Sequence, residues 1–396
     1  MDLDFSAAEQ DFRAEVRDWL ARHVPHGLPS MDTPEGFEAH RAWEALLASA
    51  RLSAVSWPEE YGGRNASLIE WLIFEEEYWA AGAPGRVTQN GIFLLAPTLM
   101  AYGTEEQRRR WLPGMARADE VWAQAWSEPE AGSDLAALKS RATRVEGGWR
   151  LYGQKTWSSR AAYASHGFGL FRTSEEGRYR GLTYFMFPLD LDLGEVTVRP
   201  IAQLDGLPGF AELFFDGVFV PDSMVLGAPG EGWRIAMATT SSERGLALRS
   251  PGRFLATADR LVQLARDYLA RDRPSRDDLS RDDVDRDFLA CDAGPELVDR
   301  AVRCWTDAEA YRLHTFATAR RLMSGAEIGS ASSMGKVFWS ELDLRMHTLA
   351  MELLGERAGE TPWLDGFLFA LAGPIYAGTN EIQRNIIAER VLGLPR

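Results

Sequence analysis

The chain has 396 residues, 45% hydrophobic and 26% charged, which is ordinary for a soluble globular protein but long for a single core. Its formal net charge of -15 argues against nucleic acid as a partner, because phosphates would be repelled, and requires local positive groups around any anionic ligand. No apolar run approaches the roughly 20 residues of a membrane span, no signal peptide is visible, and two cysteines are too few for a disulfide framework or a metal site, so a reducing cytoplasm is expected.

The first part of the chain, from Ser6 to about Arg117, has the periodicity of helices. Apolar residues between Phe5 and Leu20 recur at spacings of three, four and seven, and Ser6 is placed to cap the first helix. A break rich in Gly and Pro at 57–63 ends the early helices. A further helix is predicted to begin near Ser67.

From about Asp119 to Val225 the pattern changes to that of strands. Residues 141–155 alternate around Glu-Gly-Gly-Trp at 146–149, which is typical of a hairpin. Further strand-like runs follow at 182–187 and 211–215, with frequent Gly and Pro between them. This part is therefore predicted to be a small β domain of the sandwich or barrel kind.

Helical patterns return at Gly232, with long amphipathic stretches at roughly 232–270, 295–323 and 331–354. Between the first two lies 271–287, which holds seven Asp and five Arg and is predicted to be a solvated loop or helix face. The whole pattern predicts an α+β fold in three domains. Their predicted bounds are 1–118 for an N-terminal helical domain, 119–228 for a central β domain and 229–396 for a C-terminal helical domain.

Two segments in the middle of the chain combine polar, aromatic and turn-forming residues. Residues 124–134 read Gln-Ala-Trp-Ser-Glu-Pro-Glu-Ala-Gly-Ser-Asp and offer a hydroxyl and backbone amides for hydrogen bonds. Residues 153–159 read Gly-Gln-Lys-Thr-Trp-Ser-Ser and place a tryptophan two residues before a hydroxyl. By itself the second pattern is weak, because a tryptophan on a strand is usually part of the core.

Two further segments complete the set. Residues 212–221, followed by Gly-Glu-Gly-Trp at 230–233, continue the strand-like run at 211–215 toward the helical stretch predicted from 232. Residues 376–385 read Tyr-Ala-Gly-Thr-Asn-Glu-Ile-Gln-Arg-Asn. Together the four segments span most of the chain and resemble acyl-CoA dehydrogenases, flavoproteins that oxidise coenzyme A thioesters to their α,β-unsaturated forms. The resemblance is closest to the members built from two different subunits, including those acting on sterol side chains.

The resemblance implies the acyl-CoA dehydrogenase fold and FAD as the cofactor. Ser127 would hydrogen-bond the pyrimidine edge of the flavin, Trp157 would pack beside the ring, and Ser159, where the family usually has threonine, would lie near N5. The implied cofactor contacts are Gln124, Trp126, Ser127, Gly132, Ser133, Trp157, Ser159, Thr379 and Glu381. The implied substrate contacts are Ser133, Arg244, Ala377 and Gly378.

The family's reaction needs a carboxylate that removes the α-proton of the thioester while flavin N5 accepts the β-hydride. In many members this glutamate stands at the position of Ala377, and alanine cannot serve as a base. A subset of the family carries the glutamate on a central helix instead, and this chain has Ser-Ser-Glu-Arg-Gly at 241–245. The resemblance therefore points to Glu243 as the base, with Arg244 beside it. The backbone N–H of Ala377 would still be available to the thioester carbonyl.

Two elements that reach the FAD pyrophosphate of a neighbouring subunit in most members depart from the family pattern. The Arg-x-x-Phe-Gly motif is absent from 271–287, and the Gln-x-x-Gly-Gly motif appears as Glu-Leu-Leu-Gly-Glu at 352–356. Carboxylates are unfavourable near a diphosphate. These departures predict an oligomer in which a related second subunit completes the site. The family resemblance also implies an electron-transfer flavoprotein as electron acceptor.

Other functions remain open from the residues alone. The same fold and flavin would serve an oxidase or oxygenase, or a tailoring enzyme acting on a carrier-protein thioester. A non-catalytic subunit that supports an active partner is favoured by Ala377 and opposed by Glu243 and the flavin segments at Ser127 and Ser159.

Overall fold

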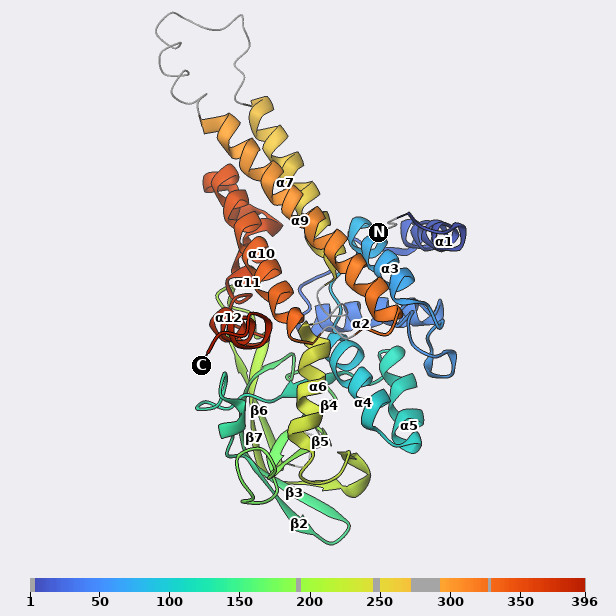
Figure 1. Ribbon diagram of the computed structural model, residues 1–396, viewed down its shortest axis with the longest axis vertical. Coiled ribbons are helices and arrows are strands. Elements are labelled where there is room, and N and C mark those ends of the chain that lie inside the picture. Colours follow the sequence, from blue (N-terminus) through green and yellow to red (C-terminus); the bar gives the residue numbers. More distant parts are fainter. Residues whose placement is uncertain (1–3, 190–193, 245–249, 272–292, 327–328, 396) are drawn as a thin grey trace, which may run out of the picture. The chain divides into compact units, whose positions relative to one another are not determined.

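Helices precede and follow a set of strands, and the predicted α+β order is confirmed (Figure 1). The computed structural model describes residues 4–189, 194–244, 250–271, 293–326 and 329–395. The chain separates into two compact units, which we call the sheet unit (21–71 and 82–248) and the C-terminal unit (1–20, 72–81 and 249–396). The three predicted domains, with boundaries after 118 and after 228, stay a prediction.

Two helices begin with a capping box, and the first of these boxes is at Ser6, the predicted cap. At the start of α1, Ser6 Oγ accepts from the N–H of Glu9 at 3.3 Å, and the Glu9 carboxylate accepts from the N–H of Ser6 at 2.7 Å. Ser67 and Glu70 form the same reciprocal pair before α3, at 3.1 and 2.7 Å. Each capping box satisfies N–H groups that have no partner inside the helix. The helices up to residue 116 are α1 (Ala7–His23), α2 (Pro34–Ser49), the short 3-10 helix η1 (Glu59–Tyr61), α3 (Leu68–Ala80), the π-helical η2 (Asn90–Leu95), α4 (Ala96–Tyr102) and α5 (Glu105–Ala116).

The strands of the sheet unit belong to one hydrogen-bonded sheet in the order β6-β7-β3-β2-β4-β5-β8, with β1 parallel to β4. The predicted hairpin is confirmed as β2 and β3, whose turn is closed by the pair Val145–Gly148 and contains Gly147 at φ 73°. The strands are β1 (Trp122–Ala125), β2 (Arg141–Val145), β3 (Gly148–Ser159), β4 (His166–Arg172), β5 (Leu182–Pro188), β6 (Val196–Ile201), β7 (Phe210–Pro221) and β8 (Val225–Leu226).

The sheet folds over on itself around an aromatic core. Phe215 of β7 packs edge-to-face against Phe171 of β4 and against Phe187 of β5, with ring centroids 5.2 Å apart in both pairs. These strands are not neighbours in the hydrogen-bonded order, so the contacts join two faces of the sheet. The predicted β domain is therefore one sheet that encloses its own core.

The predicted helical stretch at 232–270 is wrong in one respect, because the structure has two helices there. They are α6 (Gly232–Arg244) in the sheet unit and α7 (Pro251–Arg271) in the C-terminal unit. Pro251 is the first residue of α7, where a proline ring is tolerated, whereas inside a longer helix it would remove a hydrogen bond and clash. Apart from Arg271, the acidic and basic stretch at 271–287 lies outside the described residues.

The C-terminal unit is built around three long helices, α7, α9 (Ala293–Met323) and α10 (Ser332–Leu354), which lie side by side in Figure 1. Their apolar residues form one buried cluster that includes Phe254, Tyr311 and Trp339. The stretches predicted at 295–323 and 331–354 are thus confirmed as α9 and α10. The short helices α11 (Pro362–Leu371) and α12 (Asn380–Ile386) follow, and a π-helical turn, η7 (Ile387–Val391), ends the unit.

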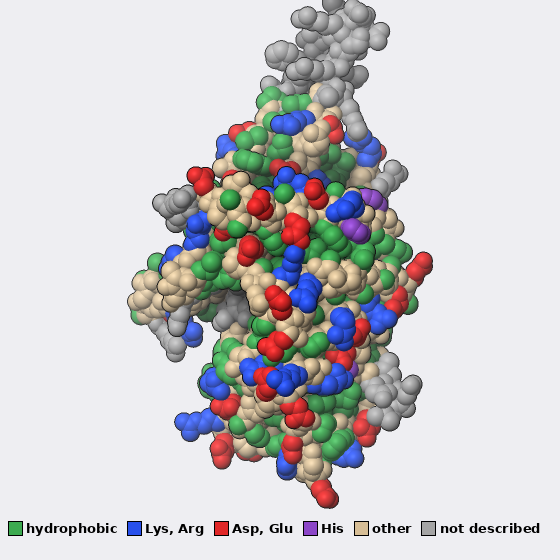
Figure 2. All heavy atoms as spheres, turned by 90° about the vertical axis from the view of Figure 1, so that its right-hand side faces the viewer, with side chains coloured by type: hydrophobic (Ala, Val, Ile, Leu, Met, Phe, Trp, Pro, Cys, Tyr) green, Lys and Arg blue, Asp and Glu red, His purple; other side chains and the backbone are tan. Residues whose placement is uncertain are grey.

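Ion pairs join the separate chain segments of the C-terminal unit. Arg13 of α1 bonds Glu76 and Glu77 of α3 at 2.8 and 3.1 Å, and Arg312 of α9 also bonds Glu76. On the face shown in Figure 2, acidic and basic side chains are interspersed rather than gathered by sign. None of the helices in the described ranges combines the length and the apolar composition needed to cross a membrane.

Candidate functional site

A β-bulge in β3 turns Trp157 outward. Lys155 pairs with Leu213 and Ser158 with Ala211 of β7, so Thr156 and Trp157 face a single residue between them. Lys155 and Ser158 are fully buried, whereas Trp157 is 59% exposed and has a φ of 59°. Bulges re-aim side chains, and positive φ in a bulky residue is a costly conformation concentrated at functional sites. The bulge thus presents an indole ring that a regular strand would have buried.

The segment at 124–134 lies directly beside this bulge. The N–H of Thr156 donates to the carbonyl oxygen of Ser127 at 2.9 Å, so two of the four sequence segments meet here. Ser127 and Ser159 are half-buried. Within the described part of the chain, their hydroxyl groups make no hydrogen bond to protein. An exposed aromatic ring with unbonded hydroxyls near it suits a planar, conjugated ligand with polar edges.

A buried ion pair that sequence reasoning missed connects the same two segments. Lys155 Nζ lies 2.9 Å from Glu128 Oε1, and the Lys155 side chain is fully buried. Burial acts to raise the pKa of the Glu128 carboxyl, but the Lys155 ammonium and hydrogen bonding by Lys139 and Ser140 outweigh it, so this pKa lies below its usual range. Burial lowers the pKa of Lys155, and Glu128 opposes that change. One available signal was the rarity of lysine, which occurs only at 139, 155 and 336.

The end of the 124–134 loop is also connected to α6. Asp134 forms an ion pair with Arg178, and the neighbouring Tyr179 packs against Trp233 of α6, with ring centroids 4.8 Å apart. Between these contacts and β1, Gly132 and Ser133 are exposed. A side chain added at Gly132 would meet open space, so this part of the loop leaves room for a ligand.

Helix α6 carries the predicted base in its last turn. Thr239, one turn before Glu243, is buried and bonds Thr98 of α4 with its hydroxyl at 2.9 Å. The helix is therefore anchored within the sheet unit close to its C-terminal end. Glu243 and Arg244 belong to this helix, but their side chains lie outside the described part of the structure.

The segment at 376–385 forms a turn followed by α12 in the C-terminal unit. Ala377 and Gly378 both have positive φ, at 57° and 79°. The buried Gln383 donates to the carbonyl oxygens of these two residues at 3.0 and 3.4 Å, and a side chain at residue 378 would come within 2.4 Å of the Gln383 amide. Thr379 caps α12 by accepting from the N–H of Ile382 at 3.2 Å.

This turn leaves three successive backbone donors unused. Among the described residues, the N–H groups of Ala377, Gly378 and Thr379 donate to no acceptor. Successive N–H groups in such a turn form a concave site for a carbonyl oxygen or an anion. Glu381 is exposed, and the pKa of its carboxyl is lowered by its own N–H at the start of α12 and by the Thr379 hydroxyl.

A second buried lysine supports the same turn. Lys336 of α10 is fully buried and donates to Asn380 Oδ1 at 2.7 Å, and the Ser340 hydroxyl donates to the same oxygen at 3.1 Å. Asn380 in turn donates its N–H to the carbonyl oxygen of Pro374 at 2.8 Å. These bonds fix the first residue of α12 to the body of the C-terminal unit.

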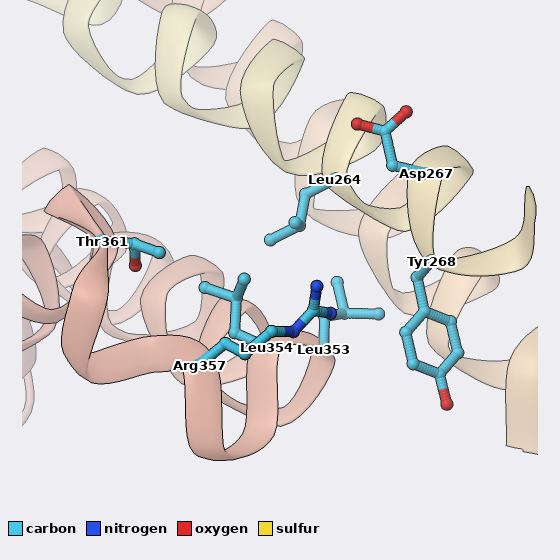
Figure 3. A pocket seen from close by; sticks show the side chains of 7 residues that line it. All are labelled: Leu264, Asp267, Tyr268, Leu353, Leu354, Arg357 and Thr361. Atoms are coloured by element: carbon cyan, nitrogen blue, oxygen red, sulfur yellow. The ribbon is translucent and has the colours of Figure 1, made fainter. Parts of the chain in front are cut away.

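The segment at 352–356 borders a pocket of about 240 Å³ in the C-terminal unit (Figure 3). Arg357 extends its side chain toward α7, which contributes Tyr268 on the opposite side. Arg300 binds the Glu352 carboxylate with two bonds of 2.5 and 2.8 Å, so a positive charge lies beside this carboxylate. The pocket is lined by Leu264, Asp267, Tyr268, Leu353, Leu354, Arg357 and Thr361.

The predicted site residues thus fall into two groups. Gln124, Trp126, Ser127, Gly132, Ser133, Trp157 and Ser159 belong to the sheet unit, together with the backbone of Glu243 and Arg244. Ala377, Gly378, Thr379 and Glu381 belong to the C-terminal unit. The structure brings Ser127 next to the bulge at Trp157, and it places 377–379 in a turn directly before Glu381 in the first turn of α12. The contacts of these residues with cofactor and substrate stay predictions.

Comparison with known proteins places the chain in a family. Its residues 6–119, 123–218 and 293–392 match the models of the N-terminal, middle and C-terminal domains of acyl-CoA dehydrogenases. The chain belongs to the acyl-CoA dehydrogenase family. The predicted fold and enzyme class are therefore confirmed, and membership of this family indicates a flavin cofactor.

This acyl-CoA dehydrogenase is similar to several named relatives and solved structures. It is 40% identical to acyl-CoA dehydrogenase IpdE1 of Mycobacterium tuberculosis, over 98% of each chain. Among solved structures it is similar to the ChsE4-ChsE5 complex of Mycobacterium tuberculosis, with 29% identity, a TM-score of 0.79 and full coverage of both chains. The Tcur3481-Tcur3483 steroid acyl-CoA dehydrogenase matches with 26% identity, a TM-score of 0.78 and full coverage of both chains.

Proposed function

We propose that this acyl-CoA dehydrogenase introduces an α,β double bond into an acyl-CoA thioester, with FAD as cofactor and Glu243 as the base. The observation that carries the proposal is the outward-facing Trp157 on its bulge, bonded through Thr156 to the Ser127 loop. These residues fit a flavin, because the indole offers a stacking face and the Ser127 and Ser159 hydroxyls are unbonded donors. FAD, when bound, supplies the acceptor for the substrate's β-hydride at its N5.

Residues of this chain supply the base and the hydrogen-bond donors that the reaction needs. Glu243 takes the α-proton, and the free N–H of Ala377 donates to the thioester carbonyl, where negative charge develops as that proton leaves. Because this hydrogen bond comes from the backbone N–H, alanine at position 377 can donate it as well as glutamate can. Arg244 and Ser133 meet polar groups of the substrate. Because one structural neighbour is a steroid acyl-CoA dehydrogenase, steroid coenzyme A thioesters are the first substrates to test.

Anaerobic substrate addition, followed by reoxidation, tests the proposed reaction. A coenzyme A thioester of the right class should bleach the flavin absorbance, and the product should contain a new α,β double bond. Reoxidation should then be fast with an electron-transfer flavoprotein and slow with oxygen. Fast reoxidation by oxygen would instead identify an oxidase, and bleaching only by carrier-protein thioesters would identify a tailoring enzyme.

We also expect Ser159 to affect the flavin more than the fold. Ser159→Ala removes a hydroxyl that bonds no described protein group, so the melting temperature should change little, while one lost hydrogen bond to the flavin is worth about 0.5–1.5 kcal/mol. The rate of flavin reduction should fall by about 2- to 10-fold. Ser159→Thr, which restores the family's usual residue, is the control and should behave like the wild type. An unchanged reduction rate and flavin spectrum in Ser159→Ala would place the hydroxyl elsewhere.

A further inference from the structure

We infer that the buried Lys155–Glu128 ion pair is a positioning device that holds the Ser127 loop and the Trp157 bulge in one fixed arrangement. That this arrangement serves a flavin ring rests on the proposed function. The contacts of Lys155 and Glu128 all lie within the sheet unit.

Lys155 holds the chain on both sides of Ser127. Its ammonium lies 3.3 Å from the carbonyl oxygen of Trp126 and 2.9 Å from Glu128 Oε1. A third bond of 2.8 Å reaches the carbonyl oxygen of Leu170 on β4. The next residue, Thr156, donates its N–H to the carbonyl oxygen of Ser127 itself. Lys155 and Thr156, which are adjacent on β3, therefore hold Trp126, Ser127 and Glu128 in place.

Glu128 secures the other end of the loop. Its carboxylate accepts from the N–H groups of Lys139 and Ser140 at 2.6 and 2.9 Å, as well as from Lys155. These three donors close the loop over residues 129–138, which include Gly132 and Ser133. Charge-assisted hydrogen bonds are about twice as strong as neutral ones, so this carboxylate holds the ends of the loop together more strongly than a side-chain amide would.

The bulge depends on the same lysine. Trp157 has a left-handed backbone conformation, which costs of order 1–3 kcal/mol and persists only where the surroundings enforce it. Lys155, two residues earlier, is anchored inside the protein by three oxygen atoms and lies over the Phe171 ring at 4.9 Å. Ser158, one residue later, is also fully buried. The tryptophan is therefore turned outward between two residues that are held in place.

The choice of lysine supports a specific role. Of 43 basic residues, three are lysine and the remaining 40 are arginine. A compact ammonium can point three donors at three oxygen atoms in a closed site, whereas a planar guanidinium is larger and has a fixed fork. Buried ion pairs contribute little net stability compared with apolar residues of similar volume. We therefore assign this pair to fixing the positions of the Ser127 loop and the Trp157 bulge.

The test compares a neutral pair with a matched exposed pair on the same loop. Lys155→Met combined with Glu128→Gln removes both charges and nearly keeps the shapes. Glu128→Asp, which keeps both charges and shortens one side chain, is the milder change if the double variant folds poorly, because Glu128→Gln alone would leave the buried Lys155 ammonium without its counter-charge. Lys139→Met is the control, because Lys139 pairs with Glu130 at 2.6 Å, and both of these side chains are 78% exposed. The full-length chain is used throughout, together with its partner subunit where one is needed to bind flavin.

The first measurement is amide hydrogen exchange without flavin. In the Lys155→Met/Glu128→Gln variant, the amides of Thr156 and Ser140 should exchange about 10- to 100-fold faster than in the wild type. In the Lys139→Met control, the exchange rates of these amides should not change. The second measurement is flavin reduction in the holoenzyme. The flavin of the Lys155→Met/Glu128→Gln variant should be reduced about 10- to 100-fold more slowly than that of the wild type, with a shifted flavin spectrum.

The outcomes separate this inference from the proposed function. Unchanged exchange and an unchanged flavin spectrum in a folded neutral-pair variant would overturn the positioning role, whatever the enzyme's activity. A change in melting temperature alone, with normal flavin reduction, would also overturn it and leave a purely structural pair. If the variants show faster exchange but the protein never takes up flavin, the positioning role of the ion pair would be supported and the proposed function would be overturned.

Discussion

Glu243→Gln is expected to abolish substrate-dependent flavin bleaching while leaving flavin and thioester binding intact. Glutamine keeps the size of the side chain but cannot accept the α-proton, and a positioned general base contributes roughly 10²- to 10⁴-fold in rate. The reduction rate under anaerobic conditions should fall by that factor. Thioester affinity, measured by the spectral shift of bound flavin, should change by less than about threefold.

The matched control for this variant lies at the other end of the same region. Glu231 precedes α6 and pairs with Arg234 at 2.8 Å on the surface. Glu231→Gln should leave flavin reduction unchanged, which would separate the loss of a base from a general effect of charge near α6. Near-normal turnover in Glu243→Gln would refute the assignment and favour a non-catalytic subunit.

A second substitution asks whether the family's two base positions are equivalent in this chain. Ala377 already has a side chain at positive φ, so replacing it with glutamate introduces no new kind of backbone strain. Ala377→Glu in the Glu243→Gln background should restore part of the lost reduction rate if both positions reach the same α-proton. The measurement is the same anaerobic reduction assay.

Expression without a partner is expected to give a flavin-poor or aggregated protein. The Arg-x-x-Phe-Gly motif that reaches the FAD pyrophosphate in most family members is absent, and Glu356 replaces a glycine in the second such element. Two structural neighbours, the ChsE4-ChsE5 and Tcur3481-Tcur3483 proteins, are complexes of two different chains. Co-expression with a related subunit that carries the missing arginine should give a yellow, active complex with about one FAD for each pair of unlike subunits.

Apolar side chains exposed on the C-terminal unit support an assembly of this kind. Ile375, Leu392 and Leu394 are 66%, 65% and 53% exposed. Burial of a leucine is worth about 1.5–3 kcal/mol, so Leu392→Asp should weaken the complex at least about tenfold if the partner covers this residue. Leu204→Asp is the control, because Leu204 is 76% exposed and belongs to the sheet unit. Native mass and the flavin-to-protein ratio are the measurements.

A stable homomer with one tightly bound FAD per chain, active without any partner, would contradict the heteromer. Arg300 pairs with Glu352, so this carboxylate is not an isolated negative charge. In a homomer, the arginines of 271–287 and the exposed Arg357 beside the pocket would be the first candidates for a phosphate contact.

Local features of the fold were predictable because neighbouring residues determine them. The reciprocal caps of Ser6 with Glu9 and Ser67 with Glu70, and the hairpin turn at Gly147, depend on donors, acceptors and backbone freedom within a few residues. The segments at 124–134, 153–159 and 376–385 pointed to the acyl-CoA dehydrogenase fold, which the family models confirm. The division of 232–270 into two helices was missed although Pro251 marked it.

What the tertiary structure alone decided are contacts between residues far apart in the chain. Alternation along β3 would bury Trp157, and only its register with β7 shows the bulge that turns the indole outward. Nothing local pairs Lys155 with Glu128, or Glu352 with Arg300, because each contact joins residues on different elements. The sequence lists the charged side chains, but only the packing determines which of them are buried and which form ion pairs. The motifs therefore determined the family, whereas the packing decided how Ser127 and Trp157 are held.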